Sequence, residues 1–316
     1  MSKGEKILPP LIALVGPTAV GKTALSLRLA ERFRMEIISA DSRLFYKGLN
    51  IGTAKPSRKE REGIPHHLID VTTPDRPWNL ADFREAAYEA IDSVHDRSNL
   101  PLLVGGTGQY VIAVLEGWQP PPRTESDSFR KALEVIADSE GSQALHARLE
   151  EVDPEAAEKI DQRNIRRVIR ALEIIELTGK PASTQRIKQA PPYRILQIGL
   201  SLPREQLYSR IDARIEAMLS EGWEEEVRQL LDQGYDFNSA PFSAIGYRQL
   251  ASYLREEISL ELAKAEIKRL TRQFVRRQAN WFKSDDVRIQ WFENSTEVIE
   301  EIGALITRWL EEPKEW

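Results

Sequence analysis

The feature that most constrains this chain is a glycine-rich loop near its start. The loop matches the pattern G-x-x-x-x-G-K-[ST] at every fixed position, with the residues Gly16, Pro17, Thr18, Ala19, Val20, Gly21, Lys22 and Thr23. An apolar run at 11–15 precedes it and predicts a buried parallel strand, and apolar residues at helical spacing follow it. A strand, a loop and a helix N-terminus in this order aim several backbone N–H groups at one point. A chance glycine turn is the weaker interpretation. The sequence therefore predicts a site for a phosphorylated ligand, with Lys22 on its phosphate oxygens and the Thr23 hydroxyl on Mg²⁺.

The segments around this loop predict a doubly wound α/β domain. After the first helix, an apolar strand at 35–40 ends at Asp41, and a second at 101–104 ends in two glycines. Asn79 is expected to cap a helix between them, and 68–71 to form a brief strand. This alternation is typical of a parallel sheet with helices on its faces.

Two proline clusters bracket a segment of different character. Between Pro120-Pro121-Pro122 and Pro191-Pro192, helical periodicity runs from about Glu125 to Gln189 with no strand between. A strand is predicted again at 194–200, and it is followed by helices over 204–283, a last strand at 287–292 and a closing helix at 298–309. We therefore expect a P-loop core formed by residues 1–118 and 192–316, with a helical insertion at 119–191 and a helical C-terminal part.

Composition excludes several classes of chemistry. The chain of 316 residues has no cysteine and four histidines without an H-E-x-x-H motif, so thiolate chemistry and a protein-built zinc site are not expected. The formal net charge of −5 does not by itself indicate a nucleic-acid binder. Residues 1–6 do not read as a signal peptide, and no apolar run approaches the roughly 20 residues of a membrane span. We expect a cytoplasmic enzyme without membrane contact or an obligate protein partner, and a monomer.

The acidic residues favour a transferase over a hydrolase. Many P-loop hydrolases hold Mg²⁺ with an Asp at the end of a second strand, but here the strand at 101–104 ends in Gly105-Gly106. The best acidic residue is Asp41, which could equally cap a turn. A loop that grips a leaving group fits this arrangement better than one that activates water.

Basic residues form groups whose role the sequence leaves open. Arg210 and Arg214 share a helix face and could clamp a polyphosphate, or could pair with Asp212 or Glu216. One further group lies in the insertion and comprises Lys159, Arg163, Arg166, Arg167 and Arg170. A basic stripe follows the predicted helix near 261–283 and comprises Lys264, Lys268, Arg272 and Arg276. A solvated charged face is the usual explanation for such a stripe, and a grip on a phosphate backbone is the alternative.

Several longer segments resemble one family. They read GPTAVGKT at 16–23, ADSRLFYKGLNIGTAKP at 40–56, LADF at 80–83, PLLVGGTGQY at 101–110, RRVIRALE at 166–173, IGYRQL at 245–250 and TRQFVRRQANWF at 271–282. Over nearly its whole length the chain resembles the tRNA dimethylallyltransferase (tRNA isopentenyltransferase) family, in its bacterial form because no cysteine-histidine finger is present. Members transfer a dimethylallyl group from dimethylallyl diphosphate to N6 of the adenosine 3′ of the anticodon, and release pyrophosphate.

The resemblance implies a role for each candidate residue. The P-loop would hold the diphosphate, with Mg²⁺ through Thr23 and added charge from Arg214 and Arg210. Asp41 would be the general base, and Thr107 would position the base or the diphosphate. The tRNA anticodon stem-loop would be contacted by Asp41, Ser42, Arg43, Leu44, Thr107, Arg130, Arg166, Arg167, Arg170, Gly246, Tyr247, Arg248, Gln273 and Arg276. The insertion would clasp the anticodon stem.

Two other functions compete with this one. An adenylate isopentenyltransferase would use the same chemistry on free nucleotides, but it would have no need of a long basic insertion. A P-loop kinase acting on a nucleoside or small metabolite, with ATP in the loop, would explain residues 16–23 but leave 41–56 without a purpose.

Overall fold

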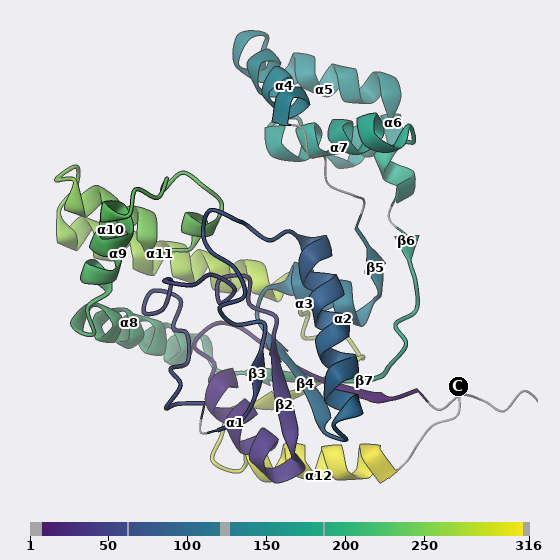
Figure 1. Ribbon diagram of the computed structural model, residues 1–316, viewed down its shortest axis with the longest axis vertical. Coiled ribbons are helices and arrows are strands. Elements are labelled where there is room, and N and C mark those ends of the chain that lie inside the picture. Colours follow the sequence, from purple (N-terminus) through teal and green to yellow (C-terminus); the bar gives the residue numbers. More distant parts are fainter. Residues whose placement is uncertain (1–7, 62, 121–126, 186, 312–316) are drawn as a thin grey trace, which may run out of the picture. The chain divides into compact units, whose positions relative to one another are not determined.

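The computed structural model describes residues 8–61, 63–120, 127–185 and 187–311 and divides into two compact units (Figure 1). One unit comprises Met1–Leu115 and Pro192–Trp316, and the other comprises Glu116–Pro191. Among the described residues, none of the helices is both long and apolar enough to cross a membrane. The predicted break at Pro121-Pro122 and the predicted helix start at Glu125 lie outside the described residues, as do residues 1–6.

A six-stranded parallel sheet forms the centre of the larger unit. Its strand order is β3-β2-β4-β1-β7-β8, where the strands are β1 (Pro10–Val15), β2 (Met35–Ser39), β3 (His66–His67), β4 (Leu100–Gly105), β7 (Arg194–Ser201) and β8 (Ile289–Glu293). In the centre, Leu14 lies between Val104 and Ile198. The carboxyl ends of parallel strands meet at one edge, so the P-loop after β1, Asp41 after β2 and Gly106 after β4 gather there. The α/β prediction is confirmed.

Helices cover both faces of the sheet. Helix α1 (Lys22–Phe33) packs against α12 (Val298–Glu311), and α2 (Leu80–Asp96) packs against α3 (Gly108–Leu115). The β1–α1–β2 and β3–α2–β4 connections run in opposite directions along the sheet, so right-handed crossovers place α1 and α2 on opposite faces. Asn79 caps α2 as predicted, because its side chain accepts from the Ala81 and Asp82 amides while Asp82 bonds back to the Asn79 amide.

The brief strand predicted at 68–71 is wrong in position. The structure has only His66–His67 extended, paired with Ile37 and Ile38 of β2. Leu68 and Asp70 adopt left-handed φ angles of 62° and 57°, which no strand can contain. Residues 68–70 therefore form a turn and not a strand.

The C-terminal part of the larger unit is a helical layer. It contains α8 (Arg204–Ser220), α9 (Trp223–Asp232), a short 3₁₀ turn η2 (Pro241–Ser243), α10 (Tyr247–Leu254) and α11 (Leu260–Ala279). Helices α8 and α11 pack side by side, and three residues of the basic stripe of α11 lie in their contact. Lys264 and Lys268 both pair with Glu216, and Arg272 pairs with Asp212. These three cations therefore hold two helices together, and neither interpretation offered for the stripe describes them.

The smaller unit is helical, with its own apolar core. Its helices are α4 (Asp127–Ser139), α5 (Gly141–Val152), α6 (Pro154–Lys159), α7 (Ile165–Thr178) and the 3₁₀ turn η1 (Ala182–Gln185). Leu145, Leu149 and Val168 are completely buried at its centre. The expectation of a segment without strands is wrong in one detail, since β5 (Trp118–Gln119) pairs antiparallel with β6 (Ile187–Lys188).

Candidate active site

The P-loop is closed around the Lys22 ammonium. Lys22 Nζ donates to the Gly16 carbonyl at 2.9 Å and to the Pro17 carbonyl at 2.7 Å. Burial lowers the pKa of Lys22 to about 8, an effect that Asp41 opposes and Arg214 reinforces. Glycine is required at position 16, where φ is 145° and a Cβ would lie 2.4 Å from the Leu200 carbonyl oxygen. Thr23 is exposed in the first turn of α1.

A buried glutamine, Gln278, joins the P-loop to the end of β4. Its Oε1 accepts from the Thr18 amide at 3.0 Å, and its Nε2 donates to the Gly106 carbonyl at 2.8 Å. The side chain is only 4% exposed. Sequence reasoning missed this residue, although its segment carried the family resemblance, because a lone amide among arginines gives no signal of its own.

Asp41 and Thr107 lie at the same edge of the sheet. The Asp41 carboxylate accepts from the Arg43 amide at 3.0 Å, which is the turn-capping role that the sequence left open. The Thr107 hydroxyl accepts from the Ser42 amide at 3.4 Å. Asp41 and Thr107 also line one cavity, so capping the turn does not remove Asp41 from the candidate site.

The two arginines of α8 occupy different positions. Arg214 lines the cavity, and burial lowers its pKa while Asp41 opposes that shift. Arg210 reaches the P-loop backbone at the Val20 carbonyl, 3.5 Å away. The alternative of pairing with their helix neighbours finds no support, because Asp212 and Glu216 are engaged by the cations of α11.

A cavity of about 520 Å³ brings these groups together within the larger unit. Its polar lining includes Thr18, Asp41, Thr107, Arg214 and Gln278. Its apolar lining comes from α8, α9 and α11, through Ile211, Ile215, Met218, Trp223, Ile267 and Phe274. One cavity with both linings can hold an anionic group and a hydrocarbon group of a single substrate.

The side chains of the loop at 246–248, which was predicted to contact RNA, are engaged with other parts of the protein. Tyr247 is completely buried and donates its hydroxyl to Glu226 at 2.7 Å, so direct RNA contact by its side chain is wrong. The Arg248 guanidinium is taken up by backbone carbonyls of Phe237, Asn238 and Ser239. At Gly246 a Cβ would lie 2.0 Å from the Trp223 ring. This glycine serves close packing.

Some predicted RNA-contacting arginines are committed to protein contacts. Arg130 forms a two-pronged ion pair with the buried Glu173, each bond 2.8 Å long, and Arg170 adds a third contact at 3.5 Å. These two arginines neutralise a buried carboxylate, and their contact with RNA stays a prediction. Arg43 donates to the Ala240 carbonyl and to the Ser243 hydroxyl.

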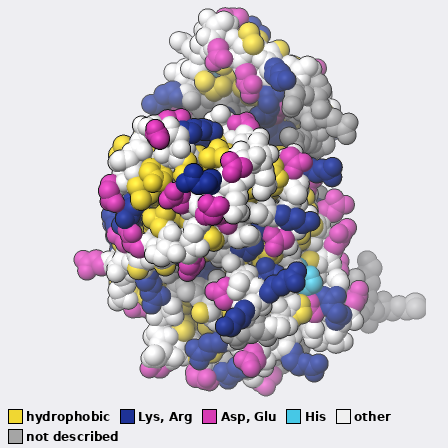
Figure 2. Space-filling model, turned by 60° about the vertical axis from the view of Figure 1, so that its left-hand side comes forward, with side chains coloured by type: hydrophobic (Ala, Val, Ile, Leu, Met, Phe, Trp, Pro, Cys, Tyr) yellow, Lys and Arg dark blue, Asp and Glu magenta, His cyan; other side chains and the backbone are white. Residues whose placement is uncertain are grey.

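The remaining candidates lie closer to solvent. Arg166 and Arg167 are exposed at the start of α7, Arg276 is exposed on α11, and Gln273 is half-buried. The side of the molecule that carries α8–α11 shows basic and acidic side chains interspersed over its surface (Figure 2). A contact with a phosphate backbone on this face would therefore depend on individual arginines.

The chain has clear relatives among known proteins. The IPP transferase family model matches residues 44–285, and the isopentenyl transferase family model matches residues 9–76. A tRNA dimethylallyltransferase from Roseiflexus sp. (strain RS-1) is 48% identical over 302 residues, which is 96% of this chain and 99% of the relative.

Solved structures agree with the sequence comparison. The full-length tRNA isopentenylpyrophosphate transferase from Bacillus halodurans is 41% identical, with a TM-score of 0.71 over 96% of this chain and 97% of that one. A eukaryotic dimethylallyltransferase acting on tRNA is 27% identical, with a TM-score of 0.83 over 96% of this chain and 80% of that one. On this evidence the chain belongs to the IPP transferase family, to which the tRNA dimethylallyltransferases belong.

Proposed function

We propose that this protein transfers a dimethylallyl group from dimethylallyl diphosphate to N6 of the adenosine 3′ of the anticodon in tRNA. The observation that carries the proposal is the single cavity in which Asp41, Arg214 and Thr18 share a lining with an apolar wall. The family and the tRNA-acting relatives support the same reaction.

The donor would bind with its diphosphate at the P-loop. Lys22 and Arg214 supply two cations at this end, and Arg210 lies beside the loop at Val20. The apolar side chains of α8 and α11, Ile211, Ile215 and Phe274 among them, would take the five-carbon chain. Positive side chains already in place around the departing pyrophosphate should supply most of the rate enhancement. An allylic C–O bond breaks readily once the negative charge of its leaving group is neutralised.

The acceptor, the N6 amine of the target adenosine, would bind next to the Asp41 carboxylate. An exocyclic adenine amine is a poor nucleophile, because its lone pair is delocalised into the ring. As N6 forms its bond to the allylic carbon, the C–O bond to the diphosphate breaks and an N6 proton passes to the Asp41 carboxylate. General-base assistance of this kind contributes roughly 10²–10⁴-fold. Thr107 would position Asp41 through the Ser42 amide.

Magnesium fits the donor end. Among the described residues there is no group of three acidic or histidine side chains that could hold a metal ion alone. Mg²⁺ commonly binds through one or two protein oxygens plus substrate phosphates, and the exposed Thr23 hydroxyl in the first turn of α1 suits that arrangement. The ion would neutralise the leaving pyrophosphate.

Recognition of the tRNA would rest on the anticodon stem-loop. The target base must leave its stack to enter the cavity, which costs a few kcal/mol and least in a loop. Among the predicted tRNA contacts, Arg166 and Arg167 of the insertion and Arg276 of α11 are exposed cations that could bind phosphates. Phosphate contacts would position the RNA, and the cavity would choose the base. We propose that the protein acts in the cytoplasm as a monomer.

The test is incubation of the protein with dimethylallyl diphosphate, Mg²⁺ and one of two acceptors, unmodified bulk tRNA or free AMP. Mass analysis of nuclease digests should find one five-carbon group on an adenosine of the tRNA. Prenylated AMP with unchanged tRNA would indicate an adenylate isopentenyltransferase instead. Phosphoryl transfer from ATP without any prenylation would favour a kinase and overturn the proposal.

A further inference from the structure

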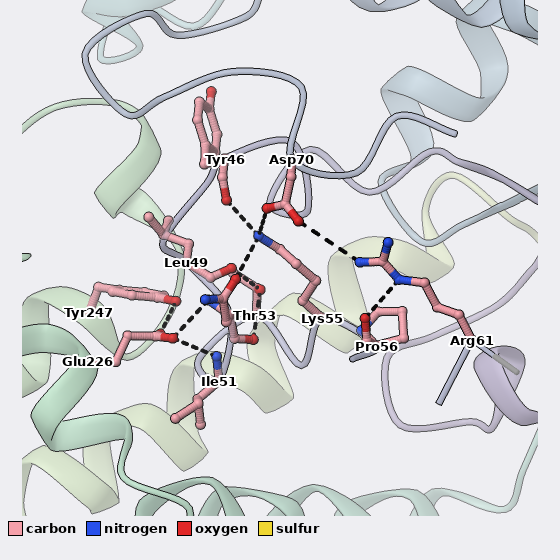
Figure 3. Close-up of polar contacts among 11 residues, drawn as sticks. Tyr46, Leu49, Ile51, Thr53, Lys55, Pro56, Arg61, Asp70, Glu226 and Tyr247 are labelled. Carbon is pink, nitrogen blue, oxygen red and sulfur yellow. Dashed lines mark hydrogen bonds and ion pairs between the residues drawn. The ribbon is translucent and has the colours of Figure 1, made fainter. Parts of the chain in front are cut away.

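Glu226 of α9 is the centre of a hydrogen-bond cluster beside the cavity (Figure 3). Its carboxylate accepts from three consecutive backbone amides, those of Asn50 at 2.9 Å, Ile51 at 2.7 Å and Gly52 at 3.2 Å. The Tyr247 hydroxyl is the fourth donor, at 2.7 Å. Burial, followed by the nearby Glu226, raises the pKa of Tyr247 well above its usual value, so the phenol stays a donor. Four donors converge on one carboxylate.

The turn that Glu226 holds, residues 49–55, is also fixed by bonds of its own Lys55 and Thr53. Lys55 Nζ donates to the Tyr46 carbonyl at 2.6 Å and to Asp70 at 2.5 Å, and it also reaches Asn50. The Thr53 hydroxyl donates to the Leu49 carbonyl at 2.7 Å. Within this turn, Gly52 and Thr53 line the cavity. Fixing the turn therefore fixes part of the cavity wall.

Helix α9 also supplies the indole ring of Trp223, which packs between Gly52 and Gly246. Trp223, three residues before Glu226, is 1% exposed and lines the cavity. A Cβ on Gly52 would lie 2.0 Å from its Nε1, and one on Gly246 would lie 2.0 Å from its ring carbons. Both backbones thus rest directly on the indole. Helix α9 joins the 49–55 turn to residues 243–247, whose first three residues also line the cavity.

These contacts are separate from those of the P-loop. The P-loop bonds to Gln278, Asn294 and Arg210, while the 49–55 turn bonds to Glu226 through Ile51 and to Tyr46 through Lys55. The segment 41–43, which carries the candidate base, is tied through Arg43 to Ala240 and Ser243. The Glu226 cluster is therefore linked through Tyr247 and the preceding residues 240–246 to the segment that carries Asp41, and the P-loop bonds named above do not involve it.

We propose that Glu226 is a positioning residue that shapes the acceptor part of the cavity. The inference rests on the proposed function, because it assigns the supported wall to the nucleoside acceptor. Only a carboxylate can accept four donors here, since an amide would turn an NH₂ group toward backbone N–H groups. Glu226→Gln should therefore loosen the 49–55 turn, although the glutamine side chain has nearly the same shape as the glutamate.

The kinetic test separates positioning from general damage. For Glu226→Gln we expect the KM for tRNA to rise and kcat to fall, together lowering kcat/KM for tRNA by about 10- to 100-fold, the effect of losing one hydrogen bond to a charged group. The KM for dimethylallyl diphosphate should stay within about twofold. Glu226→Asp, which keeps the charge, should recover part of the loss. The matched control is Glu225→Gln, an exposed neighbour on α9 that should behave as wild type.

A second measurement keeps the inference independent of the reaction. Amide hydrogen exchange of 50–52 and 244–247 should speed up in Glu226→Gln, while Thr18 and Gly21 keep wild-type exchange. If Glu226→Gln does not fold, Tyr247→Phe removes a single donor and should show a smaller change in the same amides. Equal increases of both KM values, or unchanged exchange at 50–52, would overturn the role of Glu226. If Glu226→Gln shows the expected changes in amide hydrogen exchange but the wild type transfers no prenyl group, the proposed function is overturned instead.

Discussion

Folding buries the Lys22 ammonium and lowers its pKa, and this predicts that the free energy of unfolding depends on pH. Its pKa falls from 10.5 to about 8 in the folded chain, chiefly because burial penalises the ammonium. Between these two values the unfolded chain binds one proton that the folded chain does not. The free energy of unfolding should therefore rise with pH across this window. At about 1.4 kcal/mol per pKa unit, the rise attributable to Lys22 is about 3 kcal/mol.

The assay compares wild type with Lys22→Met by urea unfolding from about pH 7 to about pH 10. Other titrating groups cancel in the difference between the two proteins. Loss of the bonds to Gly16 and Pro17 shifts that difference by a constant. Wild type should gain about 3 kcal/mol relative to the variant as the pH rises. A difference that stays constant with pH would refute the reasoning.

The same charge should govern the leaving-group site. Calorimetric titration with pyrophosphate should show affinity that weakens above about pH 8, by at most tenfold per pH unit, because the neutral amine no longer attracts the anion. The Lys22→Met variant should bind more weakly and with a flatter profile. Identical profiles for the two proteins would remove Lys22 from the anion site.

Three further predictions concern residues of the cavity and its supports. Gln278→Leu leaves the Thr18 amide and the Gly106 carbonyl without their partner and should cost about 2–4 kcal/mol in urea unfolding; a loss under about 0.5 kcal/mol would show that the bridge is dispensable. Asp41→Asn keeps an acceptor for the Arg43 amide, so tRNA binding should hold while single-turnover prenylation falls at least about 10²-fold; unchanged turnover would exclude the general-base role. Gly246→Ala should lower the melting temperature far more than Gly234→Ala, since both have positive φ but only the first would press a Cβ into Trp223; equal effects would contradict the packing argument.

The parts of the fold that were predicted correctly have local signals. The apolar run before Gly16 and the capping residue Asn79 each act within a few neighbouring residues, so the strand and the helix follow from sequence. The strand order agrees with the alternation of β and α segments. The brief third strand was misplaced because the left-handed turn at Leu68 and Asp70 has no glycine to announce it.

The contacts that were missed or misread join segments far apart in the chain. Gln278 meets Thr18 across 260 positions, and Glu226 meets Ile51 across 175. Lys268 and Arg272 of the basic stripe looked solvated because their carboxylate partners, Glu216 and Asp212, lie on α8, 52 and 60 positions away. Periodicity indicates which face of a helix is charged, but only the tertiary packing decides what that face meets.

The most direct measurement of the central claim uses two anticodon stem-loop RNAs that differ at one position. One carries adenosine 3′ of the anticodon, and the other carries purine riboside, which lacks the exocyclic amine. With dimethylallyl diphosphate and Mg²⁺, mass analysis should find one five-carbon group and released pyrophosphate only with the adenosine RNA. A prenyl group on the purine RNA, or at another nucleotide of either RNA, would contradict transfer to N6 in the cavity of Asp41 and Arg214.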